Sequence, residues 1–239
     1  MKKLKNVMGS FGLPILGLVL TVLLFSACRK DNNDQVNNTP AAGVMAFNLA
    51  VDKPAVGFSL SGGATLGNAP LNYTGYTGIY LPVYTGTREV RSFEYLSGST
   101  IATSNSTFLD SAYYSAFLMG ANGNYRNVVV KDQVNLVTPV AGKAWVRYVN
   151  AIPDSVSTVS VTIGANNETA PYATVSTFTM VDAGPVTFMV SNGSSINASR
   201  TITMEENKVY TVLLSGLPNS TDPEKSVQIK YIQNGTATQ

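Results

Sequence analysis

Short apolar runs, broken by Gly, Asn, Pro and Ser, follow one another along the chain from Gly43 onward. Within many of them apolar and polar residues alternate, as in the sequence VSVTI at residues 159–163. A period of two places successive side chains on opposite faces of a strand, and Val, Thr and Tyr favour strands. No long stretch has the periodicity of an amphipathic helix, so the pattern predicts an all-β body.

The body divides into two halves that repeat the same landmarks. The sequence YSAFLMG at residues 114–120 matches YTVLLSG at residues 210–216, at a displacement of 96 residues. Three further matches keep the same order at displacements of 98 to 102 residues: Gly86 with Gly184, Asn48 with Asn150, and Asp52 with Asp154. Slowly drifting displacements are expected of two homologous units that differ by small loop insertions. The stretch at residues 139–142 is the natural boundary between them.

Each unit has about seven strand candidates. In the second unit they lie at residues 143–150, 157–164, 173–180, 185–191, 199–204, 208–215 and 226–233. Seven short strands in roughly 95 residues, with turns at this spacing, are typical of an immunoglobulin-like sandwich. A unit of this size can bury one core without disulfides. We therefore expect two tandem immunoglobulin-like β-sandwiches, at residues 42–138 and 142–236.

The second unit also carries a family resemblance. Three of its segments resemble the domain of unknown function 4397 family: RYVNAIPD at residues 147–154, AG at residues 183–184, and KVYTV at residues 208–212. The resemblance covers most of residues 143–216. The first unit is more divergent, with Val51 where the second has Pro153, so its membership rests on the internal repeat. The resemblance implies a bacterial, extracytoplasmic β-sandwich module, often found in tandem, and it implies no settled function.

The first forty residues have the three parts of a lipoprotein signal peptide. Three lysines open the chain, residues 11–25 are apolar, and small residues precede Cys28 in the sequence LFSAC. This resembles the bacterial lipobox, so we expect residues 1–27 to be removed and the thiol of Cys28 to carry a lipid that anchors the protein to a membrane. The alternative is a membrane helix that merely contains a cysteine, but the apolar run falls short of the roughly 20 residues that a spanning helix prefers.

Residues 28–41 are polar and have no apolar periodicity, which predicts a flexible tether. At about 3.3 Å per residue, its dozen residues reach roughly 40 Å when fully extended. Lys30 and Asp31 resemble the export signal of surface lipoproteins in the Bacteroidota, although an ordinary solvated linker has the same composition. We expect an outer-membrane lipoprotein of the cell envelope, and the face of the membrane that it occupies stays open.

Composition excludes several kinds of chemistry. The formal charge of +2 becomes −1 when the three lysines before Cys28 are removed, because 13 basic and 14 acidic side chains remain. So balanced a charge argues against nucleic-acid binding. With no histidine and one cysteine, the chain can form no internal disulfide, Ser-His-Asp triad, Cys-His dyad or imidazole-based zinc site. No loop is rich enough in carboxylates for calcium, so no metal and no cofactor are expected.

Tyrosines crowd the first unit and are the main candidates for a binding surface. Tyr76, Tyr80 and Tyr84 share parity, and Tyr95 belongs to the same group. If the apolar residues between them face the core, these tyrosines form an exposed stripe of the kind that stacks on sugar rings or contacts proteins. The repeat gives the alternative, because it places Tyr80 opposite Phe178, a candidate core residue.

Two pairs of recurring residues have an architectural interpretation. Tyr114 and Tyr210 open the same late strand of each unit, and a buried tyrosine whose hydroxyl bonds the backbone would resemble a tyrosine corner. Asp52 and Asp154 follow a strand, where an aspartate sets a turn by bonding its own backbone. We expect all four to be structural.

Five other residues have weaker patterns. Ser111 and Ser155 lie in Asp-Ser-Ala and Asp-Ser-Val triplets, which resemble the O-glycosylation acceptor pattern of the Bacteroidota. Trp145 is expected either to be partly exposed or to pack at the junction between the units. Glu205 and Glu206 are adjacent, so on a strand they would point to opposite faces, and they indicate a solvated turn.

These expectations combine into a non-catalytic, lipid-anchored envelope protein that presents two sandwiches to a glycan or a protein. The alternative is a structural or assembly component of an outer-membrane complex, whose strand edges pair with another chain. An enzyme is not expected. Two distant carboxylates could be brought together for glycoside hydrolysis, but nothing in the sequence supports such a pair.

Overall fold

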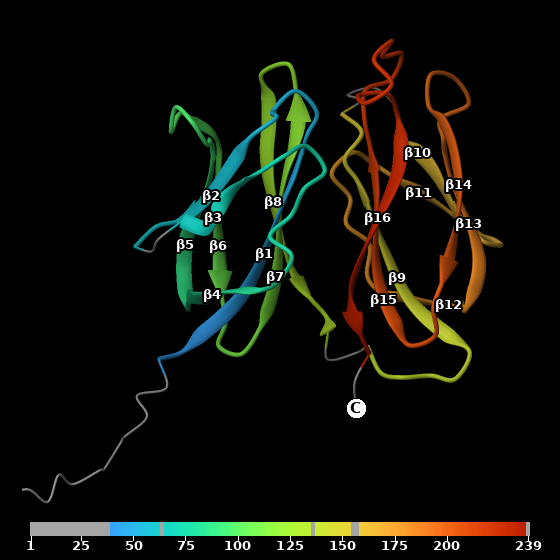
Figure 1. The fold of residues 1–239 in the computed structure, drawn as a ribbon, viewed down its shortest axis with the longest axis horizontal. Coiled ribbons are helices and arrows are strands. Elements are labelled where there is room, and N and C mark those ends of the chain that lie inside the picture. The colour runs from blue at the N-terminus through green and yellow to red at the C-terminus, as the bar shows by residue number, and fades with distance from the viewer. Residues whose placement is uncertain (1–38, 63–64, 135–136, 154–157, 238–239) are drawn as a thin grey trace, which may run out of the picture. The chain divides into compact units, whose positions relative to one another are not determined.

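The computed structural model describes residues 39–237, except residues 63–64, 135–136 and 154–157. Within these residues sixteen strands form four sheets of four strands each, and there is no α-helix. Two sheets form a first sandwich and two form a second (Figure 1). The predicted all-β fold of tandem sandwiches is confirmed. The predicted signal peptide and Cys28 lie outside the described residues.

The first sandwich has eight strands. They are β1 (Ala41–Ala50), β2 (Val56–Leu60), β3 (Thr65–Leu71), β4 (Leu81–Tyr84), β5 (Gly86–Glu94), β6 (Thr100–Phe108), β7 (Tyr113–Ala121) and β8 (Asn124–Asp132). One sheet has the order β4-β1-β7-β8 and the other the order β3-β2-β5-β6. The central strands β1 and β7 run parallel, from Gly43 opposite Tyr113 to Ala50 opposite Gly120. The other pairs in both sheets are antiparallel.

The second sandwich repeats this topology strand for strand. Its strands are β9 (Lys143–Asn150), β10 (Val159–Ile163), β11 (Asn166–Ala170), β12 (Thr179–Asp182), β13 (Gly184–Ser191), β14 (Asn197–Met204), β15 (Lys208–Ser215) and β16 (Gln228–Thr236). Its sheets have the orders β12-β9-β15-β16 and β11-β10-β13-β14, and β9 runs parallel to β15.

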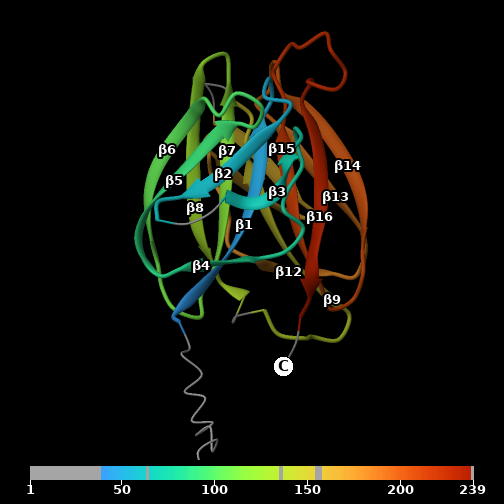
Figure 2. The same cartoon turned by 60° about the vertical axis from the view of Figure 1, so that its left-hand side comes forward.

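One strand of the second unit was missed, and one of the seven predicted strands needs correction. The edge strand β11 was not predicted, because its sequence NNETA is polar and four of its five residues are exposed. The strand predicted at residues 173–180 is mostly irregular, and β12 covers only Thr179–Asp182. The edge strands are short or lie next to the other sheet of their sandwich: β6 lies beside β8, and β14 beside β16 (Figure 2).

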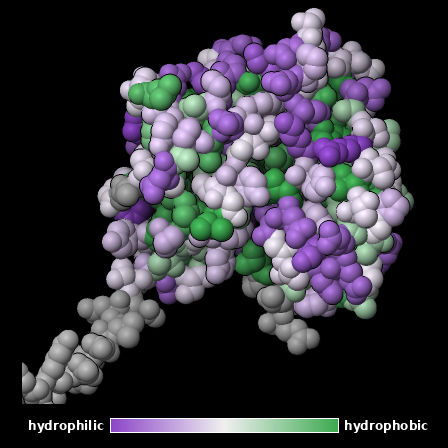
Figure 3. Space-filling view, in the orientation of Figure 1, coloured by the Kyte–Doolittle hydropathy of each residue, from purple (hydrophilic) through white to green (hydrophobic). Residues whose placement is uncertain are grey.

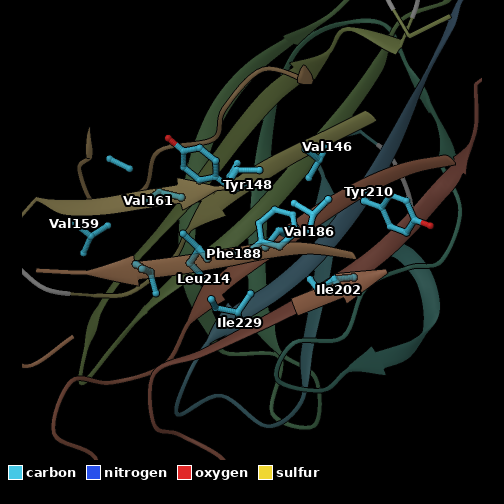
Figure 4. Close-up of a cluster of buried hydrophobic side chains, with 14 of the residues drawn as sticks. Val146, Tyr148, Val159, Val161, Val186, Phe188, Ile202, Tyr210, Leu214 and Ile229 are labelled. Atoms are coloured by element: carbon cyan, nitrogen blue, oxygen red, sulfur yellow. The ribbon is translucent and has the colours of Figure 1, made fainter. Parts of the chain in front are cut away.

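Each sandwich has its own apolar core between its two sheets. In the second core, side chains from β9, β13 and β15 meet, and Phe188 is fully buried among them (Figure 4). The first core is equivalent and contains Phe58, Val90 and Leu118.

A third apolar cluster joins the two sandwiches. Met45, Phe47 and Leu49 of β1, with residues of β7, pack against residues of β9, β15 and β16. The two central sheets therefore face each other (Figure 1) and are buried on both sides. This explains why β1, β7, β9 and β15 are apolar in near-continuous runs instead of alternating.

The repeated residues are structural in both sandwiches. The hydroxyl of Tyr114 accepts a hydrogen bond from the backbone nitrogen of Leu109 at 3.0 Å, and that of Tyr210 accepts one from Glu205 at 3.1 Å. The predicted tyrosine corners are confirmed.

Asp52 has a structural role, but the predicted bond to its own backbone is wrong. Its Oδ2 accepts hydrogen bonds from the backbone nitrogen of Asn122 at 2.9 Å and from the hydroxyl of Tyr125 at 2.7 Å. It therefore holds the turn of the β7–β8 hairpin. Asp154 lies outside the described residues.

The glycines that end the repeated sequence, Gly120 and Gly216, have backbone φ angles of 131° and 116°. A Cβ at Gly216 would overlap the carbonyl oxygen of Ser226. We expect Gly216→Ala to lower the free energy of unfolding by about 2 kcal/mol or more, measured by urea denaturation, because both the φ angle and the space require glycine.

The matched control for this substitution is Gly123→Ala. Gly123 also has a positive φ, of 86°, but a Cβ there would meet no atom within 4 Å. We expect a smaller loss for this variant, and equal losses for the two variants would contradict the steric explanation.

Candidate binding site between the sandwiches

A charged pair is buried where the two sandwiches meet. Arg147 on β9 is 2% exposed and Asp132 at the end of β8 is 3% exposed. The Nη1 atom of Arg147 lies 2.5 Å from Oδ1 of Asp132. Because an isolated charge is strongly destabilising in a protein interior, such a pair persists only when its remaining polar atoms also have partners.

Those partners come from both sandwiches. Arg147 Nε donates to Thr211 Oγ1 at 2.9 Å, and Nη2 donates to Ser115 Oγ at 2.8 Å. Asp132 Oδ2 accepts hydrogen bonds from Ser115 Oγ at 2.7 Å and from the Tyr80 hydroxyl at 2.6 Å. Each nitrogen of the guanidinium and each oxygen of the carboxylate is therefore engaged.

Aromatic rings complete the surroundings of the charged pair. The Arg147 guanidinium lies over the ring of Phe178, 4.7 Å from its centroid, and 5.8 Å from that of Phe117. Burial raises the pKa of Tyr80, and the negative charge of Asp132 raises it further, while Arg147 acts in the opposite direction. The Tyr80 phenol therefore stays protonated and continues to donate to Asp132.

The contact between the sandwiches is close to two-fold symmetric. Arg126 of the first sandwich lies over the ring of Tyr172 of the second, at 5.0 Å, and Lys230 of the second lies over Tyr73 of the first, at 5.8 Å. The two cations lie two residues apart in register, since Arg126 pairs with Met119 whereas Lys230 pairs with Leu213. The contacts therefore only approximate those of an isologous interface, which uses the same patch on both partners.

The symmetry fails at the charged pair. In the first sandwich, Met45 of β1 lies opposite Ser115 of β7. At the equivalent position of the second sandwich, Arg147 of β9 lies opposite Thr211 of β15. The contact from Ser115 to Asp132 is repeated from Thr211 to the uncharged Asn234, also at 2.7 Å. A sandwich paired with a copy of itself would bury two arginines or two aspartates without partners. The charged pair therefore specifies the pairing of unlike halves.

A cleft of about 640 Å³ lies beside this network. The first sandwich contributes Tyr80 and Tyr113, the second contributes Phe178, Val209 and Asn234, and the segment between them contributes Val134, Val137 and Thr138. The volume is within the range of roughly 300 to 1,000 Å³ that is usual for ligand sites. Both sandwiches are needed to form this cleft.

The cleft combines aromatic, apolar and polar groups. Tyr113 is 43% exposed, and its ring meets that of Tyr80 edge to face, with 4.9 Å between the centroids. Val137 packs against Val209 in the apolar part of the lining. Asp110 is exposed at the rim, where its Oδ1 accepts a hydrogen bond from the backbone nitrogen of Ala41 at 2.9 Å.

The four tyrosines predicted as a binding surface do not come together. Tyr76 stacks on Phe47 at 5.5 Å, inside the contact between the sandwiches. Tyr95 donates to the carbonyl oxygen of Asn68 at 2.9 Å, next to the other sheet. Of the four, only Tyr80 lines the cleft.

Tyr84 lies at the end of the edge strand β4 and is 55% exposed. Apolar side chains gather near this strand on the face shown in Figure 3. Ile79, which precedes the strand in the sequence, is 64% exposed. Tyr84 is outside the cleft and near Arg88, whose guanidinium lies 5.7 Å from the ring centroid.

Tyr113 is the cleft residue that the sequence interpretation missed. The signal was present, because adjacent residues of a strand point to opposite faces. Since Tyr114 faces the core, Tyr113 must face the second sandwich. Arg147 gave a similar signal, as a charge in the middle of the buried strand β9.

The remaining predicted residues have separate positions. Trp145 is half-buried at the junction, where its Nε1 donates to the carbonyl oxygen of Thr138 at 2.8 Å. Ser111 is exposed at the rim of the cleft, while Ser155 lies outside the described residues. Glu205 and Glu206 are exposed between β14 and β15, as predicted.

The described residues lack two further features. They contain no group of three or more His, Cys, Asp or Glu side chains that could hold a metal ion. They also contain no helix with the length and apolar character needed to cross a membrane.

Comparisons with known proteins give one family match. The model described as "Domain of unknown function (DUF4397)" matches residues 42–162. The match covers the first sandwich and the start of the second. The sequence resemblance instead lay in residues 143–216, and the first unit was expected to be the more divergent. The family model therefore matches more of the first unit than of the second, contrary to that expectation. No curated protein matches the chain.

Among solved structures, one is described as "Alpha-glucan recognition by family 41 carbohydrate-binding modules from streptococcal virulence factors". The two chains are 11% identical, and the match covers 81% of this chain and 97% of the other. The TM-score is 0.24, which is too low to support an argument about this protein.

The charged pair generates a first prediction. We expect Arg147→Met to lower the free energy of unfolding by roughly 3 to 5 kcal/mol in urea denaturation, because it leaves Asp132 buried without its counter-charge. Adding Asp132→Asn should restore much of this loss. The control is Arg126→Met, at an exposed arginine of the same interface, with an expected loss below about 1 kcal/mol. Equal losses for Arg147→Met and the double variant would contradict the explanation.

Tyr80 generates a prediction about pH. Its pKa is raised from the ordinary value of 10.0 in the folded protein. Above that pH the unfolded chain loses the phenolic proton while the folded protein keeps it, so the free energy of unfolding falls as pH rises. We expect Tyr80→Phe to show a shallower fall above pH 10.0 in denaturation series. The same slope in both proteins would show that Tyr80 does not contribute.

Proposed function

The chain belongs to the DUF4397 family, whose description names no function, and we propose from its geometry that it is a non-catalytic binding protein of the cell envelope. The observation that carries the proposal is the cleft of about 640 Å³ to which both sandwiches contribute. Its shape depends on the buried contact between the sandwiches, so it is formed before any ligand arrives. A pre-formed concave site with apolar walls and a few polar groups is typical of ligand binding.

Binding is better supported than catalysis. Both oxygens of Asp132 and all three nitrogens of Arg147 already have partners within the protein. A general acid or base must instead reach the proton that it transfers. The buried charged pair therefore supports the architecture of the cleft, and its exposed lining residues can contact a ligand.

The proposal includes attachment to the membrane. The signal peptide pattern that ends at Cys28 supports a lipid anchor, and the polar residues after it support a tether with a reach of roughly 40 Å. We propose that the protein is an outer-membrane lipoprotein whose body binds a glycan or a protein of the envelope.

Attachment is tested with Cys28→Ser in intact cells. We expect the variant to lose metabolic labelling with a palmitate analogue and to leave the membrane fraction, because the serine hydroxyl does not replace the thiol that takes the lipid. Protease treatment of whole cells then decides which face of the membrane is occupied. A variant that stays in the membrane fraction would contradict the lipid anchor.

Binding is tested with the chain from residue 28 to 239 carrying Cys28→Ser, on arrays of glycans and of envelope proteins. We expect saturable retention on one class of array. Recovery of one stoichiometric neighbour after crosslinking in cells, with no retention on either array, would favour an assembly component instead. If neither array retains the protein and nothing is crosslinked, the binding function is wrong.

A further inference from the structure

We infer that the cleft takes a neutral saccharide and that the ring of Tyr113 is the platform on which the sugar stacks. This inference rests on the proposed binding function and adds to it the site and the class of ligand. It follows from the position of one aromatic ring, from the charges that surround it and from the groups that hold it in place.

The ring of Tyr113 is held in a fixed position. A Cβ at Gly43 would lie 2.8 Å from Cδ1 of Tyr113, so the ring lies directly over a glycine of β1 that leaves room for it. Its other neighbour is the ring of Tyr80, whose hydroxyl is bonded to the buried Asp132. An aromatic ring that is already immobilised loses little conformational entropy when a ligand stacks on it.

The ring is also accessible. Tyr113 is 43% exposed, and it lines both the cleft of about 640 Å³ and a second hollow of about 210 Å³ on the side of β1. The apolar face of a pyranose can therefore contact the ring. By contrast, the next residue, Tyr114, faces the core and is 5% exposed.

The charges of the cleft favour a neutral ligand. Its lining includes three charged residues, Asp110, Lys131 and Asp132. Asp132 is neutralised by Arg147. The two charged residues that remain, Asp110 and Lys131, are both exposed and have opposite charges, so the lining carries no net charge that would select an ionic ligand.

The polar groups of the cleft suit hydroxyls. Asp110 can accept hydrogen bonds from a ligand at the rim, beside the exposed hydroxyl of Ser111. In the opposite wall, Nδ2 of Asn234 has no hydrogen-bond partner among the described residues. A hydroxyl or a water that reached the floor of the cleft would satisfy this amide. A ring with one apolar face and a rim of uncharged hydroxyls, which is a neutral sugar, matches all of these groups.

The test uses the chain from residue 28 to 239 with Cys28→Ser, on an array of neutral gluco-, manno-, galacto- and xylo-oligosaccharides together with acidic uronate oligosaccharides. The best neutral oligosaccharide is then titrated by calorimetry. We expect Tyr113→Ala to weaken its binding by about tenfold or more, which corresponds to about 1.4 kcal/mol. Tyr113→Phe should retain binding within about threefold, because the ring is kept, and salt should have little effect.

The matched control is Tyr84→Ala, which removes a tyrosine of similar exposure outside the cleft and should leave the affinity unchanged. Equal binding by Tyr113→Ala and the parent chain would overturn the site and leave the binding function intact. Retention only of acidic sugars, or only of an envelope protein, would overturn the ligand class in the same way. Retention of nothing by the parent chain would contradict the inference and the proposed function together.

Discussion

The buried pair of Arg147 and Asp132 is the constraint on which the arrangement of this protein depends. Two charged groups that are buried away from water are tolerated only when they lie within hydrogen-bonding distance of each other. Here the two groups come from different sandwiches. Their contact requires the two central sheets to face each other in one register. An apolar cluster also joins the sandwiches, but apolar contacts alone allow many orientations, whereas the charged pair allows few.

The two sandwiches meet as the subunits of a symmetric dimer would, within one chain. Reciprocal cation–aromatic contacts and repeated hydroxyl contacts preserve an approximate two-fold relation. Arg147 occupies the position in the second sandwich that Met45 occupies in the first. Asp132 occupies the position in the first sandwich that Asn234 occupies in the second. These two differences make the halves unlike. The benefit is specificity, because pairing between like halves leaves a charge buried without a partner. The cleft beside the pair is consequently asymmetric, with a tyrosine pair on one side and Phe178 on the other.

Stability and binding are therefore coupled through few residues. Asp132 holds Tyr80 by a hydrogen bond, and Tyr80 holds the ring of Tyr113 in the cleft. A substitution at Asp132 would change the contact between the sandwiches and also the position of the proposed platform. Substitutions at Tyr113 separate the two effects, because its ring is exposed and its loss leaves the buried pair unchanged.

Local patterns in the sequence were enough to predict strands, the tandem repeat and the tyrosine corners, because alternation and repeated motifs act over a few residues. They failed for the polar edge strand β11 and for the four tyrosines, whose surroundings depend on which face the second sandwich covers. β1, β7, β9 and β15 are apolar on both faces, so the sequence of a strand does not say which face meets which neighbour. The predicted lipid attachment at Cys28 rests on a contiguous motif, so it can be proposed without a fold. The pairing of Arg147 with Asp132, and with it the cleft, was decided by the tertiary structure, because only the packing of one sandwich on the other places these residues side by side.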